Sequence, residues 1–217
     1  MRHQNIKAPL TIIIGFGGIT VGKFLHKAIA EDYKGQIPDA DKLKLHLGGE
    51  QRISDLKSFF TNLSEENVRV VISTRTRWEA VKETLAQIDK NLINKESSNN
   101  PIKAIYANKS LDKTYPTYRK APKGFNKKSV IDKELEAYDE VIYVSSCPDN
   151  LKDFTKENLK KIKLYQLESS IQGEAKSLPK QDMDSVYALV KKLNNPLKTD
   201  EVKQARQEQR SCFSRFC

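Results

Sequence analysis

Residues Gly17–Lys23 read GGITVGK and match the spacing G-x-x-x-x-G-K. In that pattern a glycine-rich loop places backbone N–H groups around the phosphates of a nucleotide, and the lysine adds a positive charge. Phe24 stands where a serine or threonine would coordinate magnesium, and an apolar ring cannot bind that ion. The segment therefore predicts either a nucleotide-binding loop without its magnesium ligand or a tight turn that uses the conformational freedom of glycine.

Short β-branched runs alternate with amphipathic segments along the chain. The run Leu10–Phe16 (LTIIIGF) is typical of a strand buried on both faces, and from Val21 the apolar residues follow the helical i, i+3, i+4 spacing. The same alternation predicts strands at 10–16, 68–72, 102–106, 141–144 and 162–167, and helices at 21–29, 53–63, 78–92, 131–138 and 183–193. This order predicts an α/β fold with a doubly wound, mainly parallel sheet.

In such sheets ligands bind beyond the carboxyl ends of the strands, where the strand order reverses. Four segments follow predicted strands: 15–22, 73–77, 107–113 and 145–150. We therefore expect any functional site to be built from these four segments.

Taken together, the strand exits resemble the motifs of the haloacid dehalogenase-like (HAD) superfamily of phosphohydrolases. That family has a strand ending in D-x-D-G-x-T, a second strand ending in Ser or Thr, a lysine at the start of a later helix, and a strand ending in D-D-x-x-x-N. The corresponding segments here are Thr11–Thr20 (TIIIGFGGIT), Val70–Thr74 (VVIST), Asn126–Ile131 (NKKSVI) and Val141–Asn150 (VIYVSSCPDN). The resemblance covers residues 10–170 and implies a HAD-like, Rossmannoid domain with little or no cap.

The four carboxylates of the family are missing. Its nucleophilic aspartate falls on Gly15, its acid/base aspartate on Gly17, and its metal-binding aspartates on Ser145 and Ser146. Glycine offers no nucleophile, and serine hydroxyls are poor magnesium ligands beside carboxylates. The resemblance therefore implies a pseudoenzyme, with no catalytic residue, metal or cofactor, that acts by binding or regulation. The alternatives are a phosphatase with a rebuilt active site and nucleotide binding through Gly17–Lys23.

Several polar positions of the family's phosphate site survive. Ser73 or Thr74 matches its phosphate-contacting hydroxyl, Lys128 or its neighbour Lys127 matches its lysine, and Asn150 matches the end of its fourth motif. Hydroxyls at strand ends also cap helices, and lysines are commonly solvated. Two outcomes are then open: a pocket filled with side chains and water, or a metal-independent pocket for a phosphate, sulfate or phosphorylated ligand. The donors of such a pocket would be the backbone of residues 15–18 and the side chains of Ser73, Thr74, Lys127, Lys128, Ser145 and Ser146.

The chain is basic, with a formal net charge of +10, and much of this charge lies in residues 101–130. That segment carries eight Lys and Arg side chains against one acid, Asp112, and is interleaved with aromatic residues such as Tyr106 and Phe125. Cations mixed with aromatic rings are typical of surfaces that bind nucleic-acid strands or other anions. The segment predicts either an anion-binding surface or a solvated loop.

A length of 217 residues suits a single domain, which we place at residues 8–195, followed by a helical or disordered tail at 196–217. The longest apolar run, Leu10–Val21, is too short for a membrane-spanning helix, which needs about 20 residues. The tail ends RSCFSRFC, where acylated cysteines would allow contact with a membrane surface. The chain's three scattered cysteines suit a reducing, cytoplasmic or otherwise intracellular compartment.

Overall fold

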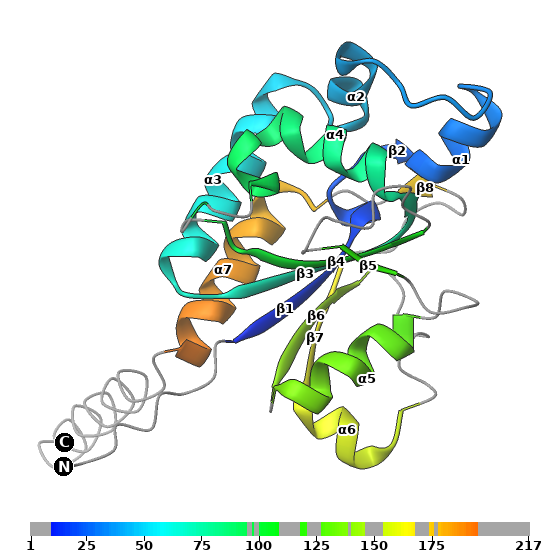
Figure 1. Cartoon of the computed structure of the whole chain (residues 1–217). Coiled ribbons are helices and arrows are strands. Elements are labelled where there is room, and N and C mark those ends of the chain that lie inside the picture. The colour runs from blue at the N-terminus through cyan, green and yellow to red at the C-terminus, as the bar shows by residue number, and fades with distance from the viewer. Residues whose placement is uncertain are drawn as a thin grey trace, which may run out of the picture.

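The computed structural model describes most of the predicted domain. The described residues are 10–94, 97, 100–108, 118–120, 127–138, 140–145, 154–167, 174–175 and 178–194. The predicted tail at 196–217 lies outside them. They form a central sheet with helices on both faces (Figure 1), and none of their helices is long and apolar enough to cross a membrane.

The sheet has six strands, and every neighbouring pair is parallel. Its strands are β1 (Thr11–Gly15), β3 (Arg69–Arg77), β4 (Ile102–Asn108), β5 (Tyr118–Lys120), β6 (Val141–Ser145) and β7 (Ile162–Gln166). Their spatial order is β5-β4-β3-β1-β6-β7. From β1 the chain adds β3, β4 and β5 on one side, then crosses over to add β6 and β7 on the other. The predicted doubly wound α/β fold is therefore confirmed, with the strand order reversing at β1.

Strand β1 lies in the middle of the sheet and is buried on both faces. Ile12, Ile13 and Ile14 are at most 1% exposed. Ile12 and Ile14 belong to the larger hydrophobic core, and Ile13 belongs to a smaller one on the opposite face. Both faces of a parallel sheet are covered, which is why this strand appears in the sequence as an unbroken apolar run.

Helices form a layer on each side of the sheet (Figure 1). The larger core includes side chains of α3 (Glu50–Glu65), α4 (Trp78–Ile88) and α7 (Lys180–Asn194). The smaller core is covered by α5 (Lys127–Ala137), which contributes Val130 and Ile131. Helix α6 (Lys156–Lys161) lies on the same side as α5.

The segment between β1 and α3 differs from the sequence prediction. It contains the 3-10 turn η1 (Phe16–Gly18), the short strand β2 (Gly22–Lys23), and helices α1 (Leu25–Glu31) and α2 (Ala40–His46). The predicted helix from Val21 begins only at Leu25, because Gly22 has a φ of +66° that a right-handed helix does not contain. Strand β2 instead pairs antiparallel with β8 (Glu174–Ala175).

Helix α2 was not predicted, because its seven residues lie in what reads as a polar connection. Its start is nevertheless well defined. The Asp39 side chain accepts a hydrogen bond from the Lys42 backbone N–H at 3.0 Å, as an N-cap residue does. Asp39 therefore acts as the N-cap residue of α2.

Candidate functional site

Three of the predicted site positions lie side by side at the carboxyl edge of the sheet. Gly15 ends β1 and is paired in register with Ser73 of β3. On the other side of β1, Ile14 is paired with Val144 of β6, so Ser145 follows next to Gly15. The prediction that the exits of these strands meet is therefore correct for Gly15, Ser73 and Ser145.

Gly15 and Ser73 belong to the face of the sheet that α5 covers. Side chains alternate between the two faces along a strand. Ile13 and Val71 point into the smaller core beneath α5, and Gly15 and Ser73 lie two residues further along the same two strands. The Ser73 side chain therefore lies on the side of β3 that faces the α5 layer.

Gly15 leaves room at the end of β1. Its backbone is extended, with φ −66° and ψ 133°, a conformation that any L-residue adopts. A Cβ atom built on Gly15 would have no described atom within 4 Å. Neither backbone strain nor close packing therefore requires a glycine here, and the position where the family has a nucleophile is open.

Ser73 and Thr74 differ in what their hydroxyls do. Ser73 is 3% exposed, and its Oγ has no hydrogen-bond partner among the described residues. The Thr74 Oγ1 accepts a hydrogen bond from the Thr76 backbone N–H at 3.0 Å and so serves a local turn. Buried polar atoms without partners are rare in proteins and call for an explanation. Of the two predicted hydroxyls, Ser73 is therefore the one available to a ligand.

Helix α5 begins with Lys127 and Lys128. Lys128 Nζ lies 2.6 Å from Asp132 Oδ2 in the next turn and 4.8 Å from the centroid of the Phe154 ring. The first turn of α5 contains no acidic residue. A helix N-terminus carries partial positive charge, so lysines there are unfavourable unless an anion lies close by. Asp132 offsets part of the positive charge at this end of α5, and a bound anion would interact favourably with it as well.

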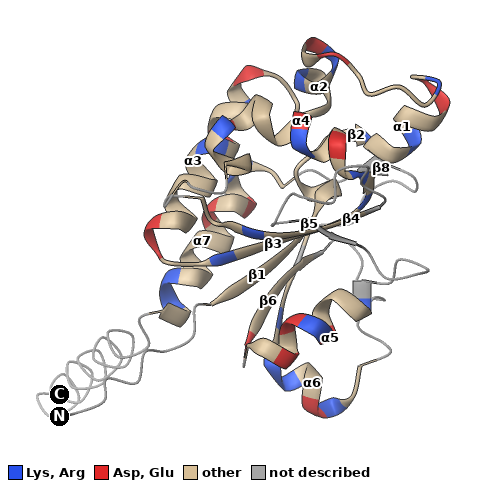
Figure 2. Cartoon of the chain, viewed as in Figure 1, with Lys and Arg blue, Asp and Glu red and all other residues tan. Residues whose placement is uncertain are grey.

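Part of the predicted site lies outside the described residues. This applies to Ser146 and Asn150, to the side chains of Lys127 and Ser145, and to residues 109–117 and 121–126 of the basic segment. Over the described helices, basic and acidic residues are interspersed (Figure 2). No single basic face stands out in this part of the molecule.

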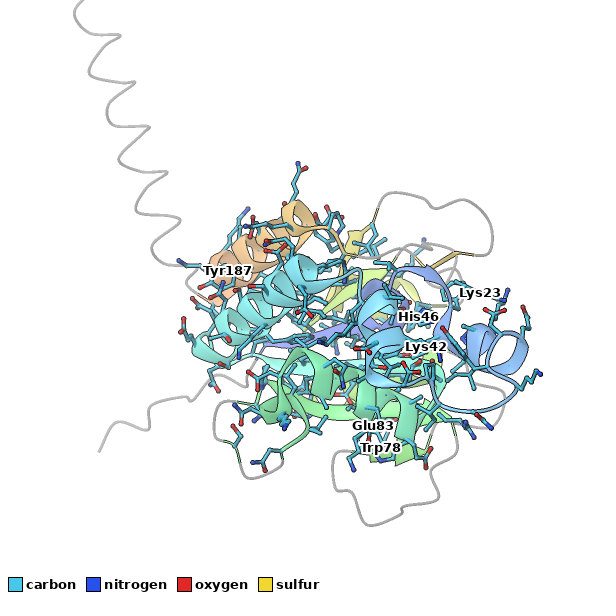
Figure 3. The ribbon with its side chains drawn as sticks, turned by 90° about the horizontal axis from the view of Figure 1, so that it is seen from above. Lys23, Lys42, His46, Trp78, Glu83 and Tyr187 are labelled. Atoms are coloured by element: carbon cyan, nitrogen blue, oxygen red, sulfur yellow. The ribbon has the colours of Figure 1, made fainter. Side chains whose placement is uncertain are left out.

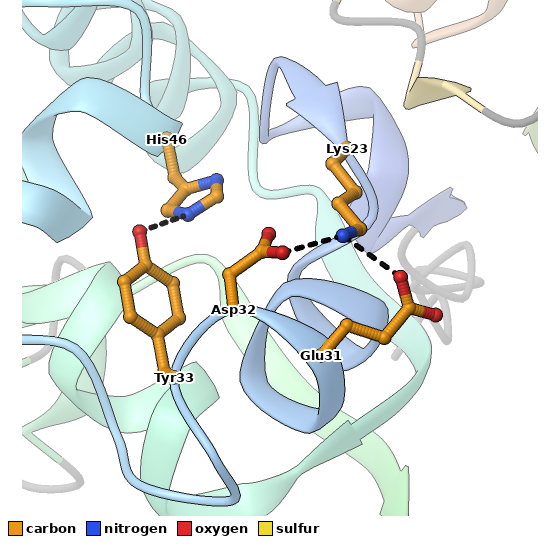
Figure 4. A network of polar contacts seen from close by, with 5 residues as sticks. All are labelled: Lys23, Glu31, Asp32, Tyr33 and His46. Carbon is orange, nitrogen blue, oxygen red and sulfur yellow. Dashed lines mark hydrogen bonds and ion pairs between the residues drawn. The ribbon is translucent and has the colours of Figure 1, made fainter.

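The Gly17–Lys23 segment does not have the geometry of a loop that leads directly into a helix. Lys23 lies in β2, and its Nζ is 2.8 Å from a carboxylate oxygen of Glu31 and 2.7 Å from one of Asp32 (Figure 4). The hydrogen bond to Asp32, followed by that to Glu31, raises the pKa of Lys23. The ammonium group is thus occupied by the chain's own carboxylates, which disfavours a role in binding phosphate.

A hydrogen bond of 3.0 Å joins the Tyr33 hydroxyl and His46 Nε2 close to this network (Figure 4). It connects Tyr33, the second residue after α1, to His46, the last residue of α2. Lys23 and His46 lie at the same end of the molecule, away from Tyr187 on α7 (Figure 3). These contacts hold the two short helices beside the loop that leaves β1.

Arg52 on α3 was missed by the sequence analysis. Its guanidinium donates hydrogen bonds to four backbone carbonyls, those of Ile19 (2.7 Å), Leu47 (3.0 Å), Gly18 (3.1 Å) and Leu178 (3.2 Å). Burial lowers the pKa of Arg52 to about 10, so the side chain is still charged at neutral pH. No local sequence signal marks this role, because the four carbonyls come from segments that meet only in the folded chain. Arg52 fixes the shape of the turn that follows Gly15.

No group of three or more His, Cys, Asp or Glu side chains within the described ranges could hold a metal ion. No family model, curated protein or solved structure matches the chain.

Proposed function

We propose that this chain is a catalytically degenerate HAD-like protein that binds phosphate or a phosphorylated ligand at the strand exits without a metal ion. The observation that carries the proposal is the buried hydroxyl of Ser73, for which the described residues provide no hydrogen-bond partner. It lies beside the open position at Gly15, on the side of the sheet that α5 covers. A phosphate oxygen would accept the hydrogen bond that Ser73 lacks.

The absence of carboxylates supports binding rather than catalysis. Gly15 offers no nucleophile, and Gly17 offers no acid or base. With glycine or serine at the positions of the four aspartates, magnesium is not needed there to offset their negative charge. The lysines at the start of α5 and the partial charge of its N-terminus then act directly on an anion.

Isothermal titration calorimetry with inorganic phosphate, in a buffer that contains EDTA, tests the proposal. We expect binding that does not need magnesium, that is weakened by Ser73→Ala and that is lost in Lys127→Ala/Lys128→Ala. The double variant Lys191→Ala/Lys192→Ala removes the same charge from the far end of α7 and is the matched control. Binding that appears only with magnesium, or that is equal in all variants, would contradict the proposal.

An activity assay distinguishes the proposed binding protein from a phosphatase with a rebuilt active site. Our proposal expects no magnesium-stimulated hydrolysis of a simple phosphoester such as p-nitrophenyl phosphate. Hydrolysis that magnesium stimulates and that Ser145→Ala abolishes would replace the binding function with the enzymatic one.

We infer an intracellular, reducing compartment from the three scattered cysteines, Cys147, Cys212 and Cys217.

The basic residues of 101–130 provide a second contact for a polyanionic partner, and the tail provides one for a membrane surface. Binding through residues 101–130 would weaken steeply with added salt, because counterions are released from a polyanion on binding.

A further inference from the structure

Aromatic and cationic side chains gather where α1 begins, next to the end of β3. The ring centroids of Phe24 and His26 are 5.7 Å apart, with their planes tilted by 32°. Lys27 Nζ lies 6.0 Å from the centroid of the Phe24 ring. Burial lowers the pKa of His26, and the positive charges of Arg75 and Lys27 lower it further. Phe24, His26 and Lys27 therefore lie together at the start of α1, and this helix packs on β3, the strand that carries Arg75. We call these four residues the α1 cluster.

Within the described part of the chain, no acidic side chain forms an ion pair with the cations of this cluster. Lys27 and Arg75 are exposed, and neither forms an ion pair with a described residue. Glu31, the acid whose charge acts on His26, is already paired with Lys23. The cluster therefore presents two cations without a counter-ion among the described residues and two π-systems, one of them the His26 imidazole, whose pKa is lowered.

Strand β3 connects the cluster to the proposed phosphate site. Arg75 follows Ser73 by two residues on β3, which corresponds to about 7 Å along a strand. Helix α1 packs on β3, and the turn η1 that leaves Gly15 also contacts β3. A ligand with its phosphate at Ser73 would reach the cluster if it extended past the edge of the sheet.

We propose that the ligand carries a planar aromatic group beyond its phosphate, as a nucleotide does, and that Phe24, His26 and Arg75 bind this group. The inference rests on the proposed phosphate site and adds the class of ligand. Bases stack on aromatic rings and on guanidinium planes whatever their sequence. This mode of binding does not use Lys23 or the G-x-x-x-x-G-K spacing.

Three probes that share a phosphate test the inference: inorganic phosphate, ribose 5-phosphate and AMP, each titrated in EDTA. AMP and ribose 5-phosphate differ only in the base. We expect AMP to bind about tenfold more tightly than ribose 5-phosphate, which is within the range for stacking of one base on a protein ring. Phe24→Ala and Arg75→Gln should reduce this ratio towards one and leave the affinity for ribose 5-phosphate almost unchanged. Lys90→Gln, which removes an exposed charge on the 3-10 turn after α4, is the control for net charge and should keep the ratio.

An NMR measurement on the unmodified chain complements the variants. The ring protons of His26, assigned by comparison with His26→Gln, should shift when AMP is added and not when ribose 5-phosphate is added. Equal affinities for these two probes without a shift of His26 would overturn the inference and leave the phosphate site in place. A ratio that persists in both Phe24→Ala and Arg75→Gln would also overturn it. If none of the three probes binds, the proposed function itself fails.

Discussion

Lys128 and Asp132 form an ion pair across one turn of α5, with 2.6 Å between Nζ and Oδ2. The second carboxylate oxygen, Oδ1, is buried without a hydrogen-bond partner among the described residues. The order of the two residues, with the cation nearer the helix N-terminus, is the less favourable one for the helix dipole. Asp132 therefore competes with an external anion for the lysine that the proposed site needs.

Asp132→Asn should increase the affinity for inorganic phosphate, because it releases Lys128 from this competition. Partly exposed pairs are worth about 0.2–1 kcal/mol, so the increase should be no more than about fivefold. Calorimetry at low salt in EDTA measures the change. Asp184→Asn removes the same charge from an exposed position on α7 and should have a smaller effect. Weaker phosphate binding by Asp132→Asn would show that the carboxylate supports the site.

Gly15→Asp should fold, with a loss of stability below about 1 kcal/mol, because the backbone at Gly15 is extended and no described atom lies within 4 Å of the added Cβ. Urea denaturation measures the loss. Gly48→Ala provides the contrast: Gly48 has a φ of +89°, and its Cβ would lie 2.8 Å from Arg52 Cδ. We expect Gly48→Ala to cost more than about 1 kcal/mol.

Restoring aspartates together at Gly15, Gly17, Ser145 and Ser146 should make phosphate binding depend on magnesium. Four carboxylates would repel an anion unless a divalent cation lies between them. Titration of the fourfold variant in EDTA and in magnesium measures this change. Phosphate binding that remains equally strong in EDTA would place the ligand away from these four positions.

Glu134 of α5 is 2% exposed and ties the helix to the sheet. Its carboxylate accepts hydrogen bonds from the Tyr106 hydroxyl at 2.8 Å and from Arg69 at 3.1 and 3.4 Å. Glu134→Ala should destabilise the protein by about 3–5 kcal/mol, because a largely buried guanidinium loses its counter-ion. In comparison, Glu140→Ala breaks a more exposed pair with Lys163 and should cost less than about 1 kcal/mol in the same denaturation experiment.

His46 should make the stability of the fold fall at acidic pH. Burial lowers the pKa of His46, and the charge of Asp32 opposes this only in part. The unfolded chain therefore binds the proton more readily, so stability is full above about pH 6.5 and falls as the pH drops through the lowered value. Thermal melts from pH 7.5 to 5 should show this fall. His46→Gln should reduce it, and His26, whose pKa is also lowered, should account for part of the remainder.

The sequence predicted the central strands well, because each is buried on two faces and therefore has a continuous apolar run. The predicted strand 10–16 corresponds to β1 at Thr11–Gly15, and 141–144 corresponds to β6 at Val141–Ser145. Strands β2, β5 and β8 have two or three residues each and exist through their pairing partners, which no local pattern reveals. The predicted helix 78–92 ends at Ile88, because Asp89 is extended and caps a separate 3-10 turn, η2 (Lys90–Ile93).

The sequence could predict which strand ends form the candidate site, but not which of its side chains have free hydrogen-bonding groups. The register that pairs Gly15 with Ser73 follows from the order of motifs along a parallel sheet. The turn that occupies the Thr74 hydroxyl and the ion pair that holds Lys128 depend on local backbone geometry and on the choice of rotamer. Neither feature can be recognised from the spacing of residues. The sequence therefore could not show which of the two hydroxyls, that of Ser73 or that of Thr74, is available to a ligand.

The four hydrogen bonds of Arg52 have a consequence for how this protein is made. Ile19 and Leu47 are within reach of Arg52 early in synthesis, whereas Leu178 lies 126 residues further along the chain. Contacts between residues so far apart form late, because a long loop must close first. On the ribosome the turn after Gly15 therefore acquires its final shape only when the segment before α7 has emerged. A chain that ends between β7 and Leu178 would have all six strands of the sheet but not the final shape of the turn after Gly15.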